Sequence, residues 1–332
     1  MTNPILVEVT RGGIVESRHH ASYAVCSADG SLIAQAGDVS SPVFPRSAVK
    51  AFQALAMVEA GVADEFGFDD AEIALACASH GGEPAHIDTA RSMLAKAGIA
   101  EEAYECGPHW PTHEDASHVL AAAGGEPKQV HNNCSGKHAG MLAFAKHLGV
   151  DLKGYTRPEH PVQKQVAAVM AELCDADVSA APCGIDGCSV PTWALPLKAW
   201  ALGFARFASG NGLSANKRDA AARIIAAVKA HPFMVAGTGR FCTELMEAVP
   251  RAFVKTGAEG VFCGAVPHAG LGIALKCDDG ASRAAEKLMA RLLIDFGGFD
   301  ANERKVQEKF AATPVLNRAN IETGVLRAIS SP

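Results

Sequence analysis

Ser47 and Lys50, three residues apart, are the pair in this chain best suited to nucleophilic chemistry. Pro45 precedes them and apolar residues follow at helical spacing, which predicts a helix that begins at Ser47. Residues three apart share a helix face, so the Lys50 amine could take the Ser47 proton. Burial or a neighbouring cation would have to lower the pKa of Lys50 from about 10.4 towards 7. Chance also supplies this pattern, and Ser214 with Lys217 forms a second match where a loop is predicted to enter a helix.

Lys255 opens a Lys-Thr-Gly sequence just before two strand-like runs. Serine–lysine acyl-transfer enzymes of the penicillin-recognising kind combine Ser-x-x-Lys with Lys-Thr-Gly on a strand beside the site. Their third motif, Ser-Asp-Asn, is absent here. Ser79, in a glycine turn that spans residues 79–82, is the nearest functional substitute. The alternative interpretation of Ser79 is a turn serine that bonds its own backbone.

A second polar cluster precedes an apolar helical run, and in it Cys134, Lys137 and His138 share one helix face. With Cys183 or Cys188 downstream, two thiolates and a third ligand could hold zinc. His138 would be the usual third ligand and Lys137 the unusual one, because a lysine must first lose its proton. Two buried cysteines that act as small apolar side chains explain the spacing equally well.

Charged residues beside these motifs are candidates for substrate contact. Asp186 lies in a glycine-rich loop and could bind an amino group, and Arg46 could bind a carboxylate in a forked geometry. Both could equally be solvated charges. Residues 237–240, Gly-Thr-Gly-Arg, form another candidate ligand loop. They do not follow a predicted strand, so we do not interpret them as nucleotide-binding.

The elements that must position these residues fall into two groups. Strand patterns lie towards the two ends of the chain, at residues 5–10, 22–26, 32–36, 260–263, 271–277 and 325–329. Helical patterns dominate between and after them, at 85–97, 136–148, 161–174, 217–230 and 281–296.

This arrangement predicts an α/β (α+β) fold in a single domain, residues 1–332. Its mixed or antiparallel sheet would come from about residues 1–44 and 259–330, with helices on both sides. A helical lobe would span about residues 45–258. A short apolar run at 73–78 is expected to be a buried segment that leads into the glycine turn.

Composition excludes several classes of function. The net charge of −6 leaves no basic surface for nucleic acid. No apolar run approaches the roughly 18 residues of a membrane span, and residues 1–8 do not resemble a secretory signal. We therefore expect a cytoplasmic protein in which the 10 cysteines are mostly reduced.

Taken together, the motifs resemble the asparaginase II family of rhizobial-type L-asparaginases. The resemblance extends from Val7 to about Ala328 and rests on residues 46–50, 78–82, 132–141 and 186–188. It implies a fold like that of serine β-lactamases and glutaminases, and hydrolysis of L-asparagine to L-aspartate and ammonia. It also implies two serine–lysine pairs, Ser47 with Lys50 and Ser79 with Lys255, and a homodimer.

The resemblance further implies a zinc site at Cys134, Lys137 and Cys188, so Lys137 replaces His138 as the expected third ligand. Substrate contacts are expected from Arg46, His80, His138 and Asp186. The chain departs from the family at Ala51, where proline often follows the lysine. Alanine should change little there, because proline is tolerated only in a first helical turn.

These expectations combine into acyl transfer, with Ser47 favoured as nucleophile, Ser79 and Lys255 relaying protons, and zinc positioning the substrate. Two other functions stay open. One is a β-lactam-hydrolysing or penicillin-binding enzyme. The other is a zinc- or thiol-dependent binding or redox-sensing protein that uses Cys134 and Cys188.

Overall fold

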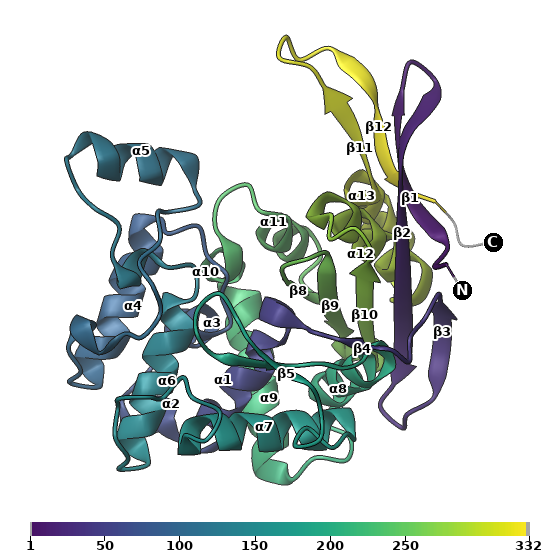
Figure 1. Ribbon diagram of the computed structural model, residues 1–332. Helices are drawn as coiled ribbons and strands as arrows, with labels where there is room; N and C mark the ends of the chain where they lie inside the picture. Colours follow the sequence, from purple (N-terminus) through teal and green to yellow (C-terminus); the bar gives the residue numbers. More distant parts are fainter. Residues whose placement is uncertain (1, 330–332) are drawn as a thin grey trace.

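One antiparallel sheet forms a side of the molecule, and a lobe of helices lies against it (Figure 1). The computed structural model describes residues 2–329. The strand order is β11-β12-β1-β2-β10-β9-β8, and β3 also pairs with β2. The strands are β1 (Ile5–Arg11), β2 (Ile14–Ser27), β3 (Leu32–Ala36), β8 (Phe253–Thr256), β9 (Val261–Val266), β10 (Leu271–Cys277), β11 (Ala312–Leu316) and β12 (Glu322–Ala328).

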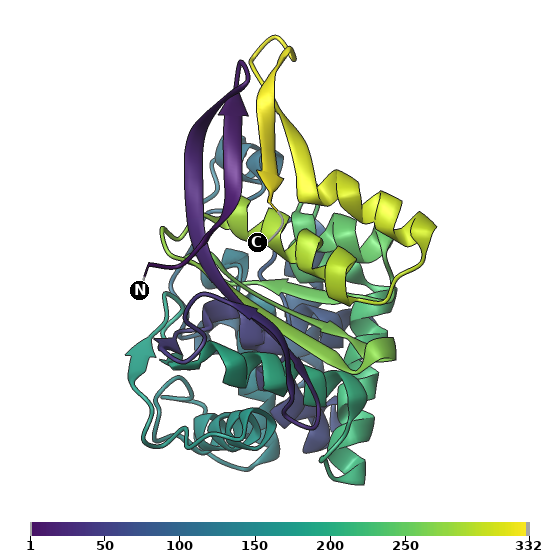
Figure 2. The ribbon, with the colours of Figure 1, turned by 90° about the vertical axis from the view of Figure 1, so that its right-hand side faces the viewer.

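Strands from the two ends of the chain meet in this sheet, which confirms the predicted α/β class. Val7 of β1 pairs with Ala328 of β12. The long strand β2 pairs with β1 through its first half and with β10 through its second half. The β1–β2 and β11–β12 hairpins therefore rise side by side from the body of the molecule (Figures 1 and 2). Two smaller ribbons pair β4 (Pro42–Val43) with β7 (Leu195–Pro196), and β5 (Cys183–Ile185) with β6 (Pro191–Trp193).

Helices cover both faces of the sheet. α8 packs against β10, β2 and β9, while α12 packs against β9, β10, β1 and β12 and is itself covered by α13. The α-helices are α1 (Lys50–Glu59), α2 (Val62–Glu65), α3 (Asp70–Ala76), α4 (Pro84–Lys96), α5 (Glu114–Ala122), α6 (Ser135–His147), α7 (Pro161–Cys174), α8 (Leu197–Ser209), α9 (Ala215–Ala230), α10 (Pro232–Ala236), α11 (Phe241–Ala248), α12 (Ser282–Phe296) and α13 (Ala301–Ala311). Short 3₁₀ turns are η1 (Arg46–Val49), η2 (Glu101–Ala103), η3 (Gln129–His131) and η4 (Pro267–Ala269).

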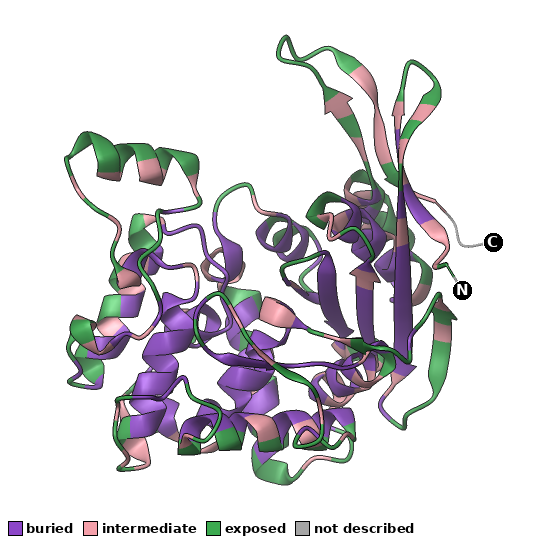
Figure 3. Cartoon of the chain, viewed as in Figure 1, coloured by how far each residue is buried: buried purple, intermediate pink, exposed green. Residues whose placement is uncertain are grey.

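A continuous apolar core joins the lobe to the sheet (Figure 3). The ring centroids of Phe52 on α1 and Phe204 on α8 lie 4.5 Å apart, and Phe204 lies 6.2 Å from Phe253 on β8. A Cβ on Gly272 of β10 would meet the Ala201 carbonyl oxygen at 2.0 Å, so glycine allows α8 to lie directly on the sheet. In contrast, α5 has no buried residue and stands apart from the lobe (Figure 3).

The helix predictions agree with the structure to within a few residues, whereas two local predictions differ. Residues 73–78 are buried, as expected, and belong mostly to helix α3. Strands β8 and β11 lie outside the predicted strand runs, and β8 extends the sheet to residues before 259. Ser47 lies in a 3₁₀ turn just before α1, not in the α-helix itself. No helix between residues 2 and 329 is both long and apolar enough to cross a bilayer.

Candidate active site

The turn that carries Ser47 is held by two contacts, an ion pair of Arg46 and the packing of Gly257. Arg46 has a positive φ of 52°, an uncommon conformation for a residue with a side chain. Its guanidinium pairs with Asp186 Oδ1 at 2.7 Å, which ties the turn to the loop after β5. Burial raises the pKa of Asp186, but the charges of Lys137 and Arg46 outweigh burial and hold it below its usual value. Arg46 and Asp186, both predicted to contact substrate, thus contact each other.

Gly257, which ends the Lys-Thr-Gly sequence, packs against the same turn. A Cβ at this position would lie 2.6 Å from the Pro45 carbonyl oxygen and 3.3 Å from the Ala48 nitrogen. Real Cβ atoms do not approach backbone this closely, so the contact requires glycine. The end of β8 and the start of α1 therefore lie in direct contact, which brings Lys255 beside Ser47's turn.

Ser79 is the point where the two predicted lysines meet. Lys255 Nζ lies 2.8 Å and Lys50 Nζ 3.0 Å from Ser79 Oγ. All three side chains are buried, with 1% of each lysine and 6% of Ser79 exposed. Burial and the charge of Lys50 lower the pKa of Lys255 to about 7, so Lys255 is half neutral near neutral pH.

Ser47 and Lys50 lie close in the chain, but no hydrogen bond joins their side chains in the described residues. Lys50 Nζ donates to the Ala78 carbonyl oxygen, to Ser79 Oγ, and to Cys134 Sγ at 3.1 Å. An ammonium has three N–H donors, so these acceptors use all of them. The Ser47 side chain is half-buried and remains more accessible than Ser79. At Ser214, the second Ser-x-x-Lys match, the hydroxyl caps helix α9.

Backbone bonds hold the Ser79 turn against three other segments. The Ser79 N–H donates to the Val235 carbonyl oxygen at 2.9 Å, and the His80 N–H donates to Asn133 at 3.1 Å. The Gly81 carbonyl oxygen accepts from the His113 N–H at 2.9 Å. These bonds fix Ser79 relative to α6, α10 and the segment before α5.

The two predicted substrate-contact histidines are fully buried. The Gly82 N–H donates to His80 Nδ1 at 3.1 Å, and His80 Nε2 lies 3.0 Å from Ser135 Oγ. His138 Nδ1 lies 2.7 Å from the Tyr155 hydroxyl. Burial holds the pKa of both imidazoles well below the usual value, so both rings are neutral. Their surroundings favour a positioning role over direct substrate contact.

Cys134, Lys137 and Cys188 converge next to Lys50. Lys137 Nζ lies 2.9 Å from Cys188 Sγ, and the two cysteines share a hydrogen bond. The bond from Cys134, together with Lys137, lowers the pKa of Cys188 to about 4 despite burial. The same bond, with burial, raises the pKa of Cys134 to about 12. Cys183, the alternative left open by spacing, is exposed on β5.

This donor set is chemically suitable for zinc. Zinc binds thiolates and nitrogen donors, and three protein ligands leave a fourth position open. Cys188 already carries thiolate character, whereas the two cysteines hold the pKa of Lys137 above its usual value despite burial, so Lys137 would have to lose its proton to bind the metal. Among residues 2–329, no group of three or more His, Cys, Asp or Glu residues could hold a metal, so any zinc site here depends on Lys137.

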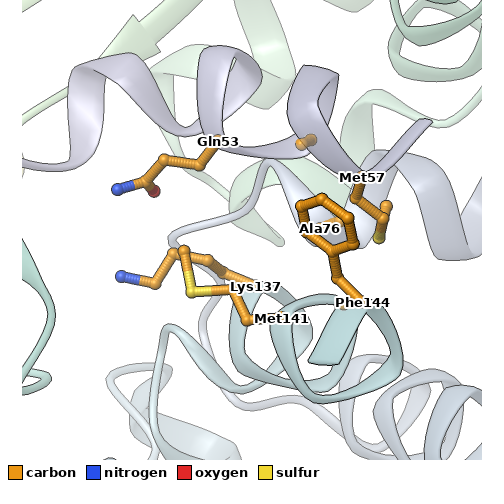
Figure 4. Close-up of a pocket in the computed structure, with 8 residues that line it drawn as sticks. Gln53, Met57, Ala76, Lys137, Met141 and Phe144 are labelled. Atoms are coloured by element: carbon orange, nitrogen blue, oxygen red, sulfur yellow. The ribbon is translucent and has the colours of Figure 1, made fainter. Parts of the chain in front are cut away.

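A small cavity adjoins this cluster, between α1, α3 and α6 (Figure 4). Its volume is about 10 Å³, enough for about one water molecule. Gln53, one turn after Lys50, and Lys137 line it and extend towards the same side (Figure 4). Gln53 Oε1 is buried without a partner among the described residues. The cavity is too small to admit a substrate.

Glu83 is a site residue that sequence analysis missed. Its carboxylate accepts from the Thr238 N–H at 2.9 Å and from the Thr238 hydroxyl at 2.7 Å. These bonds attach the candidate ligand loop, residues 237–240, to the turn that carries Ser79. In the sequence, Glu83 is marked only by its position in a turn before a helix. That position does not identify Thr238 as its partner, 155 residues away.

The fold and this site define a class: an α/β enzyme in which serine, lysine and cysteine side chains meet between a helical lobe and an antiparallel sheet. A model of the family described as L-asparaginase II matches residues 7–328. The chain therefore belongs to the L-asparaginase II family and is a hydrolase of the amidohydrolase kind. A search of curated proteins found no match.

Several solved structures are distantly similar. A β-lactamase (Mb2281c) from Mycobacterium bovis is 15% identical with a TM-score of 0.42, covering 83% of this chain and 95% of that one. A second, Mglu, is 18% identical with a TM-score of 0.36, covering 83% and 66% of the two chains. A third, a putative β-lactamase from Bacteroides dorei DSM 17855, is 13% identical with a TM-score of 0.38, covering 82% and 93%. Scores this low carry no argument about the activity of this chain.

Proposed function

We propose that the protein is an L-asparaginase, which hydrolyses L-asparagine to L-aspartate and ammonia by serine–lysine acyl transfer. One observation carries this proposal: Ser79 Oγ is hydrogen-bonded to two buried lysines, and the pKa of one of them, Lys255, is about 7. A neutral amine at this pKa is a suitable general base near neutral pH. Family membership supports an amide as the substrate.

In the acylation step, Ser47 Oγ attacks the side-chain amide carbon of asparagine. Ser79 relays the Ser47 proton to Lys255, since its hydroxyl can donate to one partner while it accepts from another. The carbon–nitrogen bond then breaks and the leaving nitrogen takes a proton back from the lysine, so ammonia departs. Backbone N–H groups of the two turns would stabilise the oxyanion, and the N–H of Ser79, His80 and Gly82 would first have to leave their present acceptors.

In the second step, water attacks the aspartyl ester on Ser47. Lys255 again accepts a proton through Ser79 and returns it by the same path to Ser47 Oγ as the ester bond breaks, so L-aspartate leaves with Ser47 and the neutral lysine restored. Lys50 holds Ser79 in place and keeps a positive charge close to Lys255, which favours the neutral form of that lysine.

Cys134, Lys137 and Cys188 would hold the zinc ion. When bound, zinc supplies a Lewis-acid centre that can orient a substrate oxygen. Arg46 and Asp186 position the Ser47 turn through their ion pair. His80 and His138 support the turn and helix that carry Ser79 and Cys134. The homodimer and the cytoplasmic location remain predictions from the resemblance and from composition.

Ammonia release from three substrates tests the proposal. Wild-type protein should release ammonia from L-asparagine, much less from L-glutamine, and should leave a chromogenic β-lactam intact. Turnover of the β-lactam without asparagine turnover would favour the penicillin-type enzyme. Thiol-dependent ligand binding without ammonia release would favour the sensor protein. Ser214→Ala is the matched control for serine substitutions, because that serine only caps α9.

A further inference from the structure

A pocket of about 280 Å³ opens beside the Ser79 turn, between that turn, the start of α5 and the loop that leads into α11. Gly81, Glu83, Asp115, Thr238 and Arg240 are among its lining residues, and we call it the Arg240 pocket. Gly81 lies two residues from Ser79, so a molecule in this pocket would lie against the turn that carries the catalytic hydroxyl. None of the predicted substrate contacts lines it.

Arg240 is the arginine that lines this pocket. It is half-buried, and no hydrogen bond or ion pair to its guanidinium is formed by residues 2–329. Most of the other partly buried cations are paired, as Arg46 is with Asp186. A guanidinium presents donors in a fork that matches a carboxylate.

Arg240 also lies close enough to the catalytic lysine to affect it. Its charge contributes to the lowered pKa of Lys255, after the larger effects of burial and of Lys50. Helix α11, which begins at the next residue, packs against β8, the strand of Lys255. The charge of Arg240 therefore lies within electrostatic range of Lys255.

The loop that carries Arg240 is held in place. Glu83 accepts both the N–H and the hydroxyl of Thr238, as described above. Gly237 has a φ of 105°, and a Cβ there would lie 2.3 Å from Glu83 Oε1, so glycine permits this contact. A charged side chain on such a fixed loop loses less conformational entropy on binding.

Three carboxylates share the pocket lining with Arg240. Glu83, Glu114 and Asp115 all line it, the last two from the first turn of α5. A pocket lined by both a cation and carboxylates matches a zwitterion, with a carboxylate and an ammonium on neighbouring atoms. The α-carbon of a free amino acid carries this pair of charges.

We propose that Arg240 binds the α-carboxylate of the amino acid substrate. The acidic side chains that line the same pocket, Glu83, Glu114 and Asp115, would bind its α-ammonium. This assignment rests on the proposed asparaginase function and names the residue that recognises the substrate's backbone end. It explains why Arg46, already paired with Asp186, is not needed for that role. The side-chain amide would then have to reach past Gly81 towards Ser47 and Ser79, which do not themselves line this pocket.

Three substrates that differ by one group each test the proposal: L-asparagine, β-alaninamide, which lacks the α-carboxylate, and succinamate, which lacks the α-amino group. Arg240→Gln should lower kcat/KM for L-asparagine and succinamate by about 10- to 100-fold, the loss of a charge-assisted hydrogen bond. Turnover of β-alaninamide should change by less than about two-fold. Arg318→Gln, in the exposed turn between β11 and β12, is the matched control.

Binding measured by calorimetry tests the role of Arg240 separately from the proposed asparaginase activity, because it does not require ammonia release. Wild-type protein should bind L-aspartate more tightly than β-alanine, which is aspartate without its α-carboxylate, and Arg240→Gln should abolish that preference even if no ammonia is released. An equal loss for all three substrates would show a merely structural role for Arg240. Unchanged kinetics, or no preference for L-aspartate in wild-type protein, would also overturn the assignment.

Discussion

At the scale of single residues, the two lysines at Ser79 take different roles because their neighbours differ. Lys50 donates to three acceptors, which fixes its position. Lys255 is equally buried, but within residues 2–329 it donates to only two acceptors, Ser79 Oγ and the Thr256 carbonyl oxygen, and the charge of Lys50 acts against its protonation. The proposed base is therefore Lys255, with Lys50 as the cation that tunes it.

This difference predicts a pH dependence. Lys255 must be neutral to accept a proton and its pKa is about 7, so kcat/KM for L-asparagine should rise with pH through about 7 and level off above it. Lys255→Arg keeps a fixed charge and should lose at least about 10²-fold of the activity at every pH. Ammonia release by wild type and by Lys255→Arg, measured in buffers that range from acidic to alkaline pH, tests both predictions. Full activity in Lys255→Arg would show that another group is the base.

Metal content is a second residue-scale prediction. Purified wild-type protein should contain zinc, and Cys188→Ala should lose most of it, because the thiolate that contacts Lys137 is removed. Cys183→Ala is the matched control, since Cys183 is exposed and five residues away. Elemental analysis of wild type, Cys188→Ala and Cys183→Ala measures their zinc content. Equal zinc in both variants would exclude the proposed ligand set.

At the scale of elements, the site depends on the contact between the end of β8 and the turn before α1. Gly257→Ala would place a methyl group 2.6 Å from the Pro45 carbonyl oxygen. The strand and the turn must then separate, so kcat should fall by at least about 10-fold, because small displacements of reacting groups are costly. Gly107→Ala is the control, because a Cβ there meets nothing within 4 Å.

Steady-state kinetics together with thermal unfolding of both glycine variants test this contact. Gly257→Ala should lose much of its activity while it remains folded at the assay temperature, and Gly107→Ala should match wild type in both measurements. Retained kcat in Gly257→Ala would mean that β8 and the Ser47 turn tolerate displacement.

Sequence patterns predicted those elements whose signals are local. Helix α7 begins at Pro161, in the first turn where proline is tolerated, and its predicted bounds agree with the structure. Residues 73–78 were predicted to be buried but not to be helical, because a short apolar run fits a strand or a buried helix equally well. The capping box of Asp69 and Glu72 was the signal for helix. β8 has four residues, mostly buried, and offers no alternation.

The site was predictable in its residue types but not in its pairings. Spacing places Ser47 and Lys50 together, whereas the bonds of Lys50 depend on Ala78 and Cys134, which only the fold brings near. The choice between Cys183 and Cys188 as the second sulfur ligand likewise depended on the fold, which buries Cys188 against Lys137 and leaves Cys183 exposed. Long-range contacts of this kind have no periodic signal in the chain.

At the scale of the whole molecule, the lobe and the sheet share one core, which supports a single folding unit. Phe204 connects them through its contacts with Phe52 and Phe253. Phe204→Ala should lower the free energy of unfolding by about 3–5 kcal/mol and shift one cooperative transition. Ile14→Ala, with 74% of that residue exposed, should change it by less than about 0.5 kcal/mol.

Denaturant unfolding followed by circular dichroism and by tryptophan fluorescence measures this directly. The two signals should coincide in wild type and in Phe204→Ala, because the tryptophans of the lobe and the strands of the sheet unfold together. Two separate transitions would instead show that the sheet and the helical lobe are independent domains.

In the proposed mechanism the aspartyl group passes through Ser47, and peptide mapping of acid-quenched reactions measures this step. Wild-type protein mixed with L-asparagine should carry an aspartyl ester on the peptide that contains Ser47, and Ser47→Ala should carry none and lose at least about 10³-fold of its ammonia release. Ser214→Ala should behave as wild type. An ester on the peptide that contains Ser79, or undiminished turnover by Ser47→Ala, would contradict the assignment.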